Sequence, residues 1–300
     1  MIRPRIALLA GLATVAACVA SAPPRFASSP TAARGVLFIV GGGNQSIDLV
    51  REFVNLAGGP GKARIAILPM ATSDAVATGA EKEAQLDSLG ADAFVVNVTR
   101  AQADADSVVQ LIRGATGIWF PGGDQTLLAA ALNGSATLRA IHARYDAGAV
   151  VGGTSAGAAV MSDSMITGNQ FYPGVATPTD TGSFTRLGRR TIEIAPGFGF
   201  LHNAIVDQHF IRRQRQNRLF AVVLERPSLL GVGIDEGTVL KVAPDGKWTV
   251  LGRSAVMVFD ARAAKVTSPP ALGATDIRVS VLPAGSVFDP QTGRATLPAN

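Results

Sequence analysis

The sequence predicts an α/β fold with a doubly wound, mostly parallel sheet flanked by helices and with a C-terminal antiparallel β extension. Short apolar runs alternate with helical stretches from Gly35 to Gly152, which is the pattern of a parallel sheet covered on both faces. Two of these runs stop at glycine-rich turns, residues 41–43 and 121–123, and doubly wound sheets bind ligands at such strand ends. Beyond Leu230 the chain changes to short strand-like runs separated by Gly and Pro turns, which favours antiparallel strands.

The individual elements follow from the same pattern. The predicted strands are the apolar runs at residues 35–40, 64–68, 93–98, 117–120 and 149–152. The predicted helices are the stretches at residues 46–56, 79–89, 104–113, 125–132 and 137–146. Residues 166–190 show no regular periodicity and are expected to form an irregular flap.

Composition excludes several classes of protein. Hydrophobic residues make up 47% and charged residues 16% of the 300 residues, so neither disorder nor a coiled coil is expected. One cysteine and three histidines exclude a disulfide framework and make a metal site improbable, and no cofactor is expected. Without Arg3 and Arg5, 25 basic and 22 acidic residues leave a net charge of +3, which does not indicate a nucleic-acid partner.

The N-terminal residues match an export signal. Arg3 and Arg5 precede the apolar stretch Ile6 to Ala17, which is followed by small residues and is too short to span a membrane. Cys18 ends a Val-Ala-Ala-Cys run that resembles the lipobox of bacterial lipoproteins, and ordinary cleavage after Ala22 is the alternative. We therefore expect an exported protein, periplasmic or extracellular, that contacts the membrane only through a lipid on Cys18 or is released.

This interpretation divides the chain into four parts. They are a signal peptide at residues 1–22, a flexible spacer rich in Pro, Ser and Ala at 23–34, an α/β domain at 35–242, and a β-rich extension packed on that domain at 243–300.

A candidate nucleophile lies between a buried strand and an apolar helix. Gly153-Thr154-Ser155-Ala156-Gly157 fits the G-x-S-x-G elbow, a strained turn that lifts the serine hydroxyl onto the top of a sheet. Ala156 opens the helix, so its N–H can face a developing oxyanion. The alternative is a Gly-Ser turn without chemistry.

A serine nucleophile needs a base, and histidine is the residue used most often. His142 lies in a polar helical stretch and is expected to be a solvated surface residue, whereas His202 lies in a loop-like region. His209 follows the apolar run in AIVDQHF, where a strand would leave it at the edge of the sheet. His209 is therefore the predicted base.

The third member of such a triad is a carboxylate that orients the histidine. Glu236 ends a strand-like run in GVGIDEG and is the predicted acid, while Asp235 should alternate to the other face. Asp163 and Glu193 lie between the serine and the histidine and remain alternatives. The order serine, histidine, Glu236 argues against an α/β-hydrolase, in which the acid precedes the histidine.

Four blocks of the sequence resemble the cyanophycinases and occur in the order in which that family has them. Cyanophycinases are serine peptidases related to aspartyl dipeptidases, and their fold is similar to that of class I glutamine amidotransferases. The blocks are IWFPGGDQ at residues 118–125, GGTSAGAAVMS at 152–162, DQHFIRRQRQNRL at 207–219 and GVGIDEGT at 231–238. The resemblance implies hydrolysis of cyanophycin, a polyaspartate whose side chains each carry an arginine, to β-aspartyl-arginine dipeptides. It also implies a homodimer.

The resemblance implies roles for residues at matching positions. Ser155 would be the nucleophile, His209 the base and Glu236 its partner, and the N–H groups of Gly123 and Ala156 would bind the oxyanion. The positions that match the family's substrate pocket are Gln125, Asp207, Gln208, Arg213, Arg215 and Arg218.

A cluster of arginines directly follows the predicted base. If residues 212–225 are helical, Arg215 and Arg218 share a face with Arg212 nearby. Guanidinium groups can bind the free carboxylates of cyanophycin's arginines, and Asp207 or Asp124 could bind their guanidinium groups. A solvated basic helix is the alternative.

The sequence as a whole predicts an exported serine hydrolase that degrades cyanophycin through an acyl-enzyme on Ser155. An α- or isoaspartyl dipeptidase of the same fold, and an inactive surface protein that binds acidic polymer, are the alternatives. Two features depart from the family resemblance. An export signal differs from what an intracellular enzyme that mobilises a storage polymer would carry. Related aspartyl dipeptidases place the acidic triad residue between the serine and the histidine, whereas Glu236 follows both. Arg189-Arg190 and the loop before it have no clear counterpart.

Overall fold

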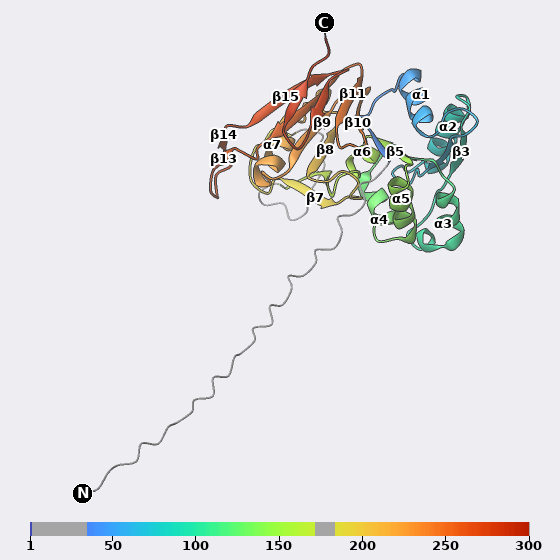
Figure 1. Cartoon of the computed structure of the whole chain (residues 1–300), viewed down its shortest axis with the longest axis horizontal. Helices are drawn as coiled ribbons and strands as arrows, with labels where there is room; N and C mark the ends of the chain where they lie inside the picture. Colours follow the sequence, from blue (N-terminus) through green and yellow to red (C-terminus); the bar gives the residue numbers. More distant parts are fainter. Residues whose placement is uncertain (2–34, 172–183, 300) are drawn as a thin grey trace. The chain divides into compact units, whose positions relative to one another are not determined.

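A nine-stranded sheet forms the centre of the computed structural model, which describes Met1 and residues 35–171 and 184–299 (Figure 1). All the described elements belong to the unit that spans Ala32–Asn300. One half of the sheet is parallel, in the order β1-β5-β4-β2-β3. These strands are β1 Val36–Val40, β2 Arg64–Ile67, β3 Asp92–Val95, β4 Gly117–Phe120 and β5 Val150–Thr154.

Helices cover both faces of the parallel strands. Phe38 and Val40 of β1 pack in the cluster that contains Phe53 of α1 and Leu86 of α2. Leu37 and Ile39 of the same strand pack in the cluster that contains residues of α3 to α6. This alternation explains why the strands read as continuous apolar runs, because both faces are buried. The helices are α1 Ile47–Leu56, α2 Ala75–Asp87, α3 Asp106–Arg113, α4 Gln125–Leu132, α5 Ala136–Asp146 and α6 Ala156–Ala159, with a 3-10 turn η1 at Gln102–Asp104.

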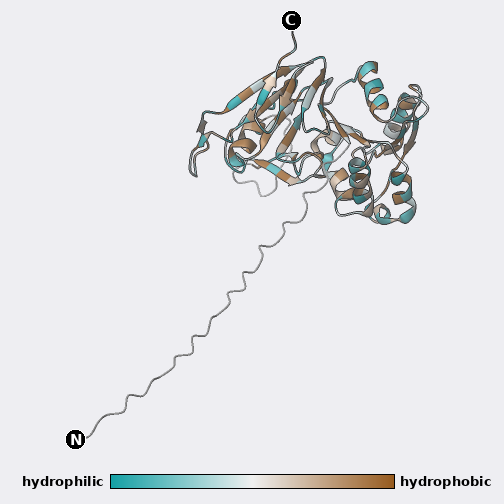
Figure 2. Ribbon diagram, viewed as in Figure 1, coloured by the Kyte–Doolittle hydropathy of each residue, from teal (hydrophilic) through white to brown (hydrophobic). Residues whose placement is uncertain are grey.

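Polar N-caps set where these helices begin. The side chains of Ser46, Asp124 and Ser135 accept hydrogen bonds from the first turns of α1, α4 and α5. Asp74 caps α2 in the same way through the Ala77 N–H, so α2 begins before the predicted residue 79. In Figure 2 these helices carry both hydrophilic and hydrophobic residues, as expected for one buried and one solvated face.

The C-terminal strands continue the sheets by hydrogen bonding. Strand β10 Thr238–Val242 pairs antiparallel with β1, and β11, β16 and β17 extend the same edge. A second sheet has the order β15-β12-β9-β8, in which β8 and β9 are parallel. The strands concerned are β8 Ala204–Gln208, β9 Leu230–Ile234, β11 Trp248–Gly252, β12 Ala255–Asp260, β15 Arg278–Pro283, β16 Val287–Asp289 and β17 Arg294–Thr296, with a small hairpin of β13 Lys265–Val266 and β14 Ala274–Thr275. The predicted α/β fold with antiparallel C-terminal strands is confirmed.

Two predictions about local structure are wrong. The expected irregular flap begins instead with a strand, β6 Ser164–Gln170, which pairs antiparallel with β7 Ile192–Pro196 and has a register shift between Ile166 and Gln170. The expected helix at residues 212–225 begins only at Gln216, where α7 Gln216–Glu225 starts after a series of turns.

Other predictions lie outside the described residues. These are the signal peptide with Cys18, the spacer at residues 23–34, and residues 172–183 of the predicted flap. In the described part of the chain no helix is long and apolar enough to cross a membrane.

Candidate active site

Ser155 occupies a strained turn between β5 and α6. Its backbone angles are φ 54° and ψ −109°, a region that non-glycine residues rarely adopt and that is typical of functional sites. The flanking glycines are required by packing, because a Cβ on Gly157 would stand 2.0 Å from the Phe120 carbonyl oxygen and a Cβ on Gly153 would stand 2.5 Å from the Gly157 oxygen. The local geometry is therefore that of the predicted nucleophile elbow.

The structure brings the three predicted triad residues into one hydrogen-bonded chain. The Ser155 hydroxyl lies 2.8 Å from His209 Nε2, and His209 Nδ1 lies 2.7 Å from Glu236 Oε1. His209 is buried and Glu236 is partly exposed. With the proton on Nδ1, the imidazole donates to Glu236 and leaves Nε2 free to accept the serine proton.

The last residue of β1 and the loop after it bind the three segments that carry this chain through their carbonyl groups. The Ser155 N–H donates to Val40 O at 3.1 Å and the His209 N–H donates to Gly41 O at 2.6 Å. Gly237, directly after Glu236, donates to Gly42 O at 2.8 Å. Segments far apart in the sequence are thus fixed by one short loop.

The same loop must be glycine for the side chains to fit. A Cβ on Gly42 would stand 2.3 Å from His209 Cε1, and a Cβ on Gly43 would stand 2.9 Å from Glu236 Oε2. Both glycines also have positive φ angles, 104° and 67°. The sequence indicates residues 41–43 as a glycine-rich turn at a strand end, but their contacts with the base and the acid depend on packing that no local pattern reveals.

Burial lowers the pKa of the His209 imidazole below its usual value. The hydrogen bond that His209 donates to the Glu236 carboxylate raises that pKa, and the cations of Arg213 and Arg215 lower it. The net effect keeps the imidazole neutral at neutral pH, which is the state a general base requires.

The two alternative acids, Asp163 and Glu193, have hydrogen-bond partners other than His209. Asp163 Oδ1 accepts a hydrogen bond from His202 Nδ1 at 2.8 Å, on the exposed surface. Glu193 accepts hydrogen bonds from the side chains of Thr167 and Asn169. Neither carboxylate contacts His209 among the hydrogen bonds of the described residues.

His142, which was predicted to be a solvated surface residue, packs against the protein. His142 is half-buried, stacks on Phe200 with ring centroids 4.1 Å apart, and lies 2.7 Å from the Phe198 carbonyl oxygen. The prediction that it is a surface residue is wrong, because helix α5 turns this polar position toward the chain that precedes β8.

The two N–H groups predicted to bind the oxyanion flank the elbow. Ala156 is the first residue of α6, and Gly123 lies in the turn after β4 with φ 135°. In the described part of the chain, neither N–H donates to another backbone carbonyl. A Cβ on Gly123 would stand 2.2 Å from the Ala71 carbonyl oxygen, so only glycine fits there.

The arginine cluster is divided between interior and surface, contrary to expectation. Arg218 and Asp207 are almost completely buried, and the Arg218 guanidinium binds both oxygens of Asp207. It also lies 4.5 Å from the ring centroid of Phe184. Asp207 and Arg218 therefore bind each other, and each neutralises the charge of the other inside the protein.

The remaining predicted substrate residues differ in exposure. Arg215 is partly buried and donates to the carbonyl and side-chain oxygens of Gln208, and Gln208 is itself buried. Gln125 is buried and donates to the carbonyl oxygens of Ile166 and Thr167, which anchors β6. Arg213 is exposed and is the member of this set that can reach a ligand most directly.

Asp235 and Arg189 hold loops in place. Asp235 accepts hydrogen bonds from the N–H groups of Ile211 and Arg212 and from the Ser254 hydroxyl. It therefore fixes the turn that follows the base. Arg189 donates to the carbonyl oxygens of Thr267 and Ala271 in the β13–β14 hairpin.

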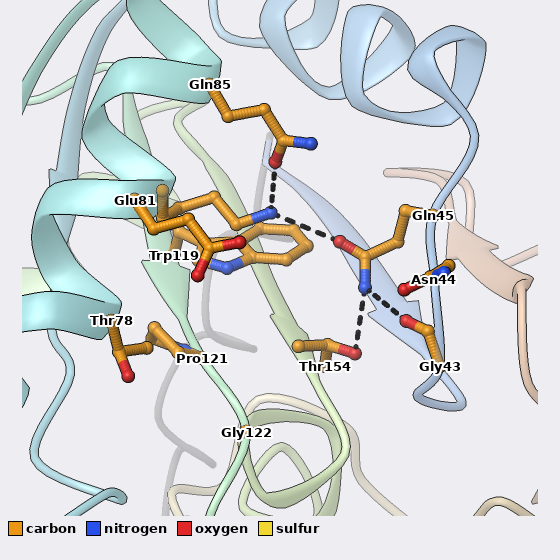
Figure 3. A pocket seen from close by; sticks show the side chains of 11 residues that line it. Gly43, Asn44, Gln45, Thr78, Glu81, Gln85, Trp119, Pro121, Gly122 and Thr154 are labelled. Atoms are coloured by element: carbon orange, nitrogen blue, oxygen red, sulfur yellow. Dashed lines mark hydrogen bonds between the residues drawn. The ribbon is translucent and has the colours of Figure 1, made fainter. Parts of the chain in front are cut away.

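A pocket of about 430 Å³ lies beside the elbow (Figure 3). It is bounded by the loop after β1, by helix α2 and by the ends of β4 and β5, and its lining includes Gln45, Lys82, Trp119, Gly122 and Thr154. No group of three or more His, Cys, Asp or Glu side chains among the described residues is arranged to hold a metal ion.

The fold and the site define a hydrolase with a serine nucleophile on an α/β sheet. The model of Peptidase family S51 matches residues 37–250, and the chain belongs to this family. It is therefore a serine-type peptidase.

Curated relatives extend this similarity over most of the chain. The chain is 30% identical over 272 residues to a protein of Nostoc sp. named cyanophycinase, covering 87% of each sequence. It is 32% identical over 242 residues to a cyanophycinase of Synechococcus elongatus, covering 78% of this chain and 71% of that protein.

A solved structure supports the fold. The crystal structure of a peptidase from an acI-B1 Actinobacterium superposes with a TM-score of 0.64 at 22% identity, covering 86% of this chain and 98% of that one.

Proposed function

We propose that this peptidase is a cyanophycinase, which hydrolyses cyanophycin to β-aspartyl-arginine dipeptides through an acyl-enzyme on Ser155. The observation that carries the proposal is the hydrogen-bonded chain from Ser155 through His209 to Glu236 in a protein whose relatives are named cyanophycinases. The exposed cation of Arg213 beside this site supports the choice of a substrate that is rich in carboxylates.

The proposed reaction begins with proton transfer from Ser155 to His209. As Oγ attacks a backbone carbonyl of the polyaspartate, Nε2 takes its proton, and Glu236 stabilises the imidazolium that forms. His209 then gives the proton to the leaving amine, so that the peptide bond breaks and an ester to Ser155 remains. Water, deprotonated by His209, hydrolyses that ester and restores the serine.

The N–H groups of Gly123 and Ala156 are the proposed oxyanion donors. They stand on either side of the elbow and have no backbone acceptor among the described residues. Loss of one such donor typically costs about 100- to 1,000-fold in kcat.

Substrate binding is assigned mainly to exposed charges. Arg213 can bind the free carboxylate of an arginyl branch, with Arg215 close behind it, while Asp124 is exposed and can face a guanidinium. The proposed part of Asp207, Gln208, Arg218 and Gln125 is to hold these elements in position, since all four side chains are buried.

An α- or isoaspartyl dipeptidase of the same fold is the alternative, because the same triad would serve it. Purified mature protein incubated with insoluble cyanophycin, with soluble products analysed by mass, distinguishes the two. Release of β-aspartyl-arginine by the parent and none by Ser155→Ala supports the proposal. Intact polymer with Ser155 labelled by a serine-reactive probe indicates the dipeptidase, and intact polymer without labelling indicates an inactive binding protein.

We further propose that the enzyme is exported and lipid-anchored through Cys18, on the basis of its N-terminal sequence. Labelling with radioactive palmitate in a bacterial host tests this, with Cys18→Ser as the matched variant. Label on the parent and none on Cys18→Ser supports an anchor. Unlabelled protein that is cleaved after residue 22 and released contradicts it.

A further inference from the structure

Lys82 lies at the edge of the pocket beside the elbow, where its ammonium contacts neutral side chains. Its ammonium donates to Gln45 Oε1 at 3.2 Å and to Gln85 Oε1 at 2.6 Å, and it lies 4.8 Å from the ring centroid of Trp119. Figure 3 shows Gln45, Gln85 and Trp119 converging on one point from the loop after β1, from α2 and from β4. In the described part of the chain, no carboxylate forms an ion pair with Lys82.

Burying the Lys82 ammonium without a nearby anion is unfavourable in free energy. Burial lowers the pKa of Lys82 to about 8, and the neighbouring Glu81 raises it only in part. Glu81 is exposed, so water screens its charge. Two neutral glutamine oxygens and an aromatic face leave one ammonium N–H for a ligand, and a carboxylate would supply the missing charge.

The pocket adjoins the nucleophile directly. Thr154 and Gly122 both line it; Thr154 precedes Ser155, and a Cβ on Gly122 would stand 3.4 Å from Ser155 Cβ. Gln45 links the two ends of the pocket, because its Nε2 donates to Thr154 Oγ1 at 3.3 Å while its Oε1 accepts from Lys82. A group bound there lies within reach of a substrate attached to Ser155.

We propose that Lys82, held by Gln45 and Gln85, binds a free carboxylate of the substrate in this pocket and so determines specificity next to the scissile bond. This identification of the ligand rests on the proposed function. In cyanophycin, the carboxylate belongs to an arginyl branch of the polymer.

This subsite is separate from the arginine cluster. A second pocket of about 540 Å³ is lined by Arg212, Arg213 and Phe184 and shares no residue with the first. Two separate cationic sites suit a substrate that carries more than one carboxylate.

Labelling of Ser155 tests the subsite independently of the natural substrate. Two fluorophosphonate probes that differ only in carrying a carboxylate or its methyl ester are compared by their second-order labelling rates. The parent should prefer the carboxylate probe by about 10- to 100-fold, the size expected for a hydrogen bond to a charged group. Lys82→Met should reduce the ratio to about one, because Met keeps the packing on Trp119 but not the charge.

Two further variants control this result. Lys62→Met removes an exposed lysine outside the pocket and should keep the preference. Gln85→Glu places a carboxylate beside Lys82 and should abolish the preference without removing the lysine. Thermal unfolding of each variant checks that the fold is retained.

A preference that persists in Lys82→Met, or that is absent in the parent, overturns the inference. Calorimetry with Nα-acetyl-arginine and its methyl ester gives a second measure that needs no reaction at Ser155, and equal binding of the two by the parent overturns it as well. If the carboxylate preference depends on Lys82 but cyanophycin stays intact, the subsite stands and the proposed function fails.

Discussion

Gly42 lies directly against the imidazole of His209, with the position of a Cβ only 2.3 Å from His209 Cε1. The neighbouring Gly41 carbonyl accepts the His209 N–H. Because His209 itself has a positive φ of 50°, its position depends on this contact with the loop after β1 and not on strand geometry alone.

Replacing Gly42 by alanine should displace His209. We expect Gly42→Ala to lower kcat by about 100-fold, the size associated with a shift of about 1 Å in a catalytic group. Gly59→Ala is the matched control, because Gly59 also has a positive φ, 83°, but has nothing within 4 Å of its Cβ position. Steady-state kinetics of both variants check this, and equal activities would contradict the packing argument.

The acid of the triad can be identified by neutralising each candidate. Glu236→Gln should lower kcat by a factor on the order of 10,000, as neutralising the acid does in other serine peptidase triads. Asp163→Asn and Glu193→Gln should stay near the parent rate, since neither carboxylate contacts His209. A large loss in either of these two variants with little loss in Glu236→Gln would assign the acid differently.

The buried pair of Asp207 and Arg218 should matter for stability. Asp207→Asn leaves the Arg218 cation buried without its anion, which should lower the free energy of unfolding by about 3–5 kcal/mol. The double variant Asp207→Leu/Arg218→Met removes both charges and should recover much of that loss. Urea unfolding measures both; a stable Asp207→Asn would show that the pair is not what holds β8 and α7 together.

The pH dependence of kcat/KM should report the pKa of His209 in the free enzyme. Activity rises with pH as the imidazole loses its proton, and because burial lowers this pKa, the rise should lie below the usual value of 6.5. Arg213→Gln removes a cation that disfavours the imidazolium, so its rise should move to higher pH. Arg213→Lys keeps the charge and should leave the profile in place, whereas a shift of equal size in both variants would point to a cause other than charge.

Much of the fold was predictable because its signals are local. Both faces of β1 to β5 are buried, so each strand is a continuous apolar run, and α4 and β4 have the predicted bounds. The elbow around Ser155 was predictable for the same reason, since a strained turn needs its glycines within a few residues. Helix α2 begins at Ala75 and not at the predicted residue 79, because the side chain of Asp74 caps it.

What the sequence by itself determined is the α/β class, the elbow at Ser155 and the choice of His209 over the other histidines. Only the tertiary structure decided that Glu236, and not Asp163, contacts His209, that Arg218 points inward to Asp207, and that Lys82 meets Gln45 beside the elbow. These contacts join residues from different strands and helices. Periodicity says which face of an element is buried, but the partner on that face depends on how distant segments pack.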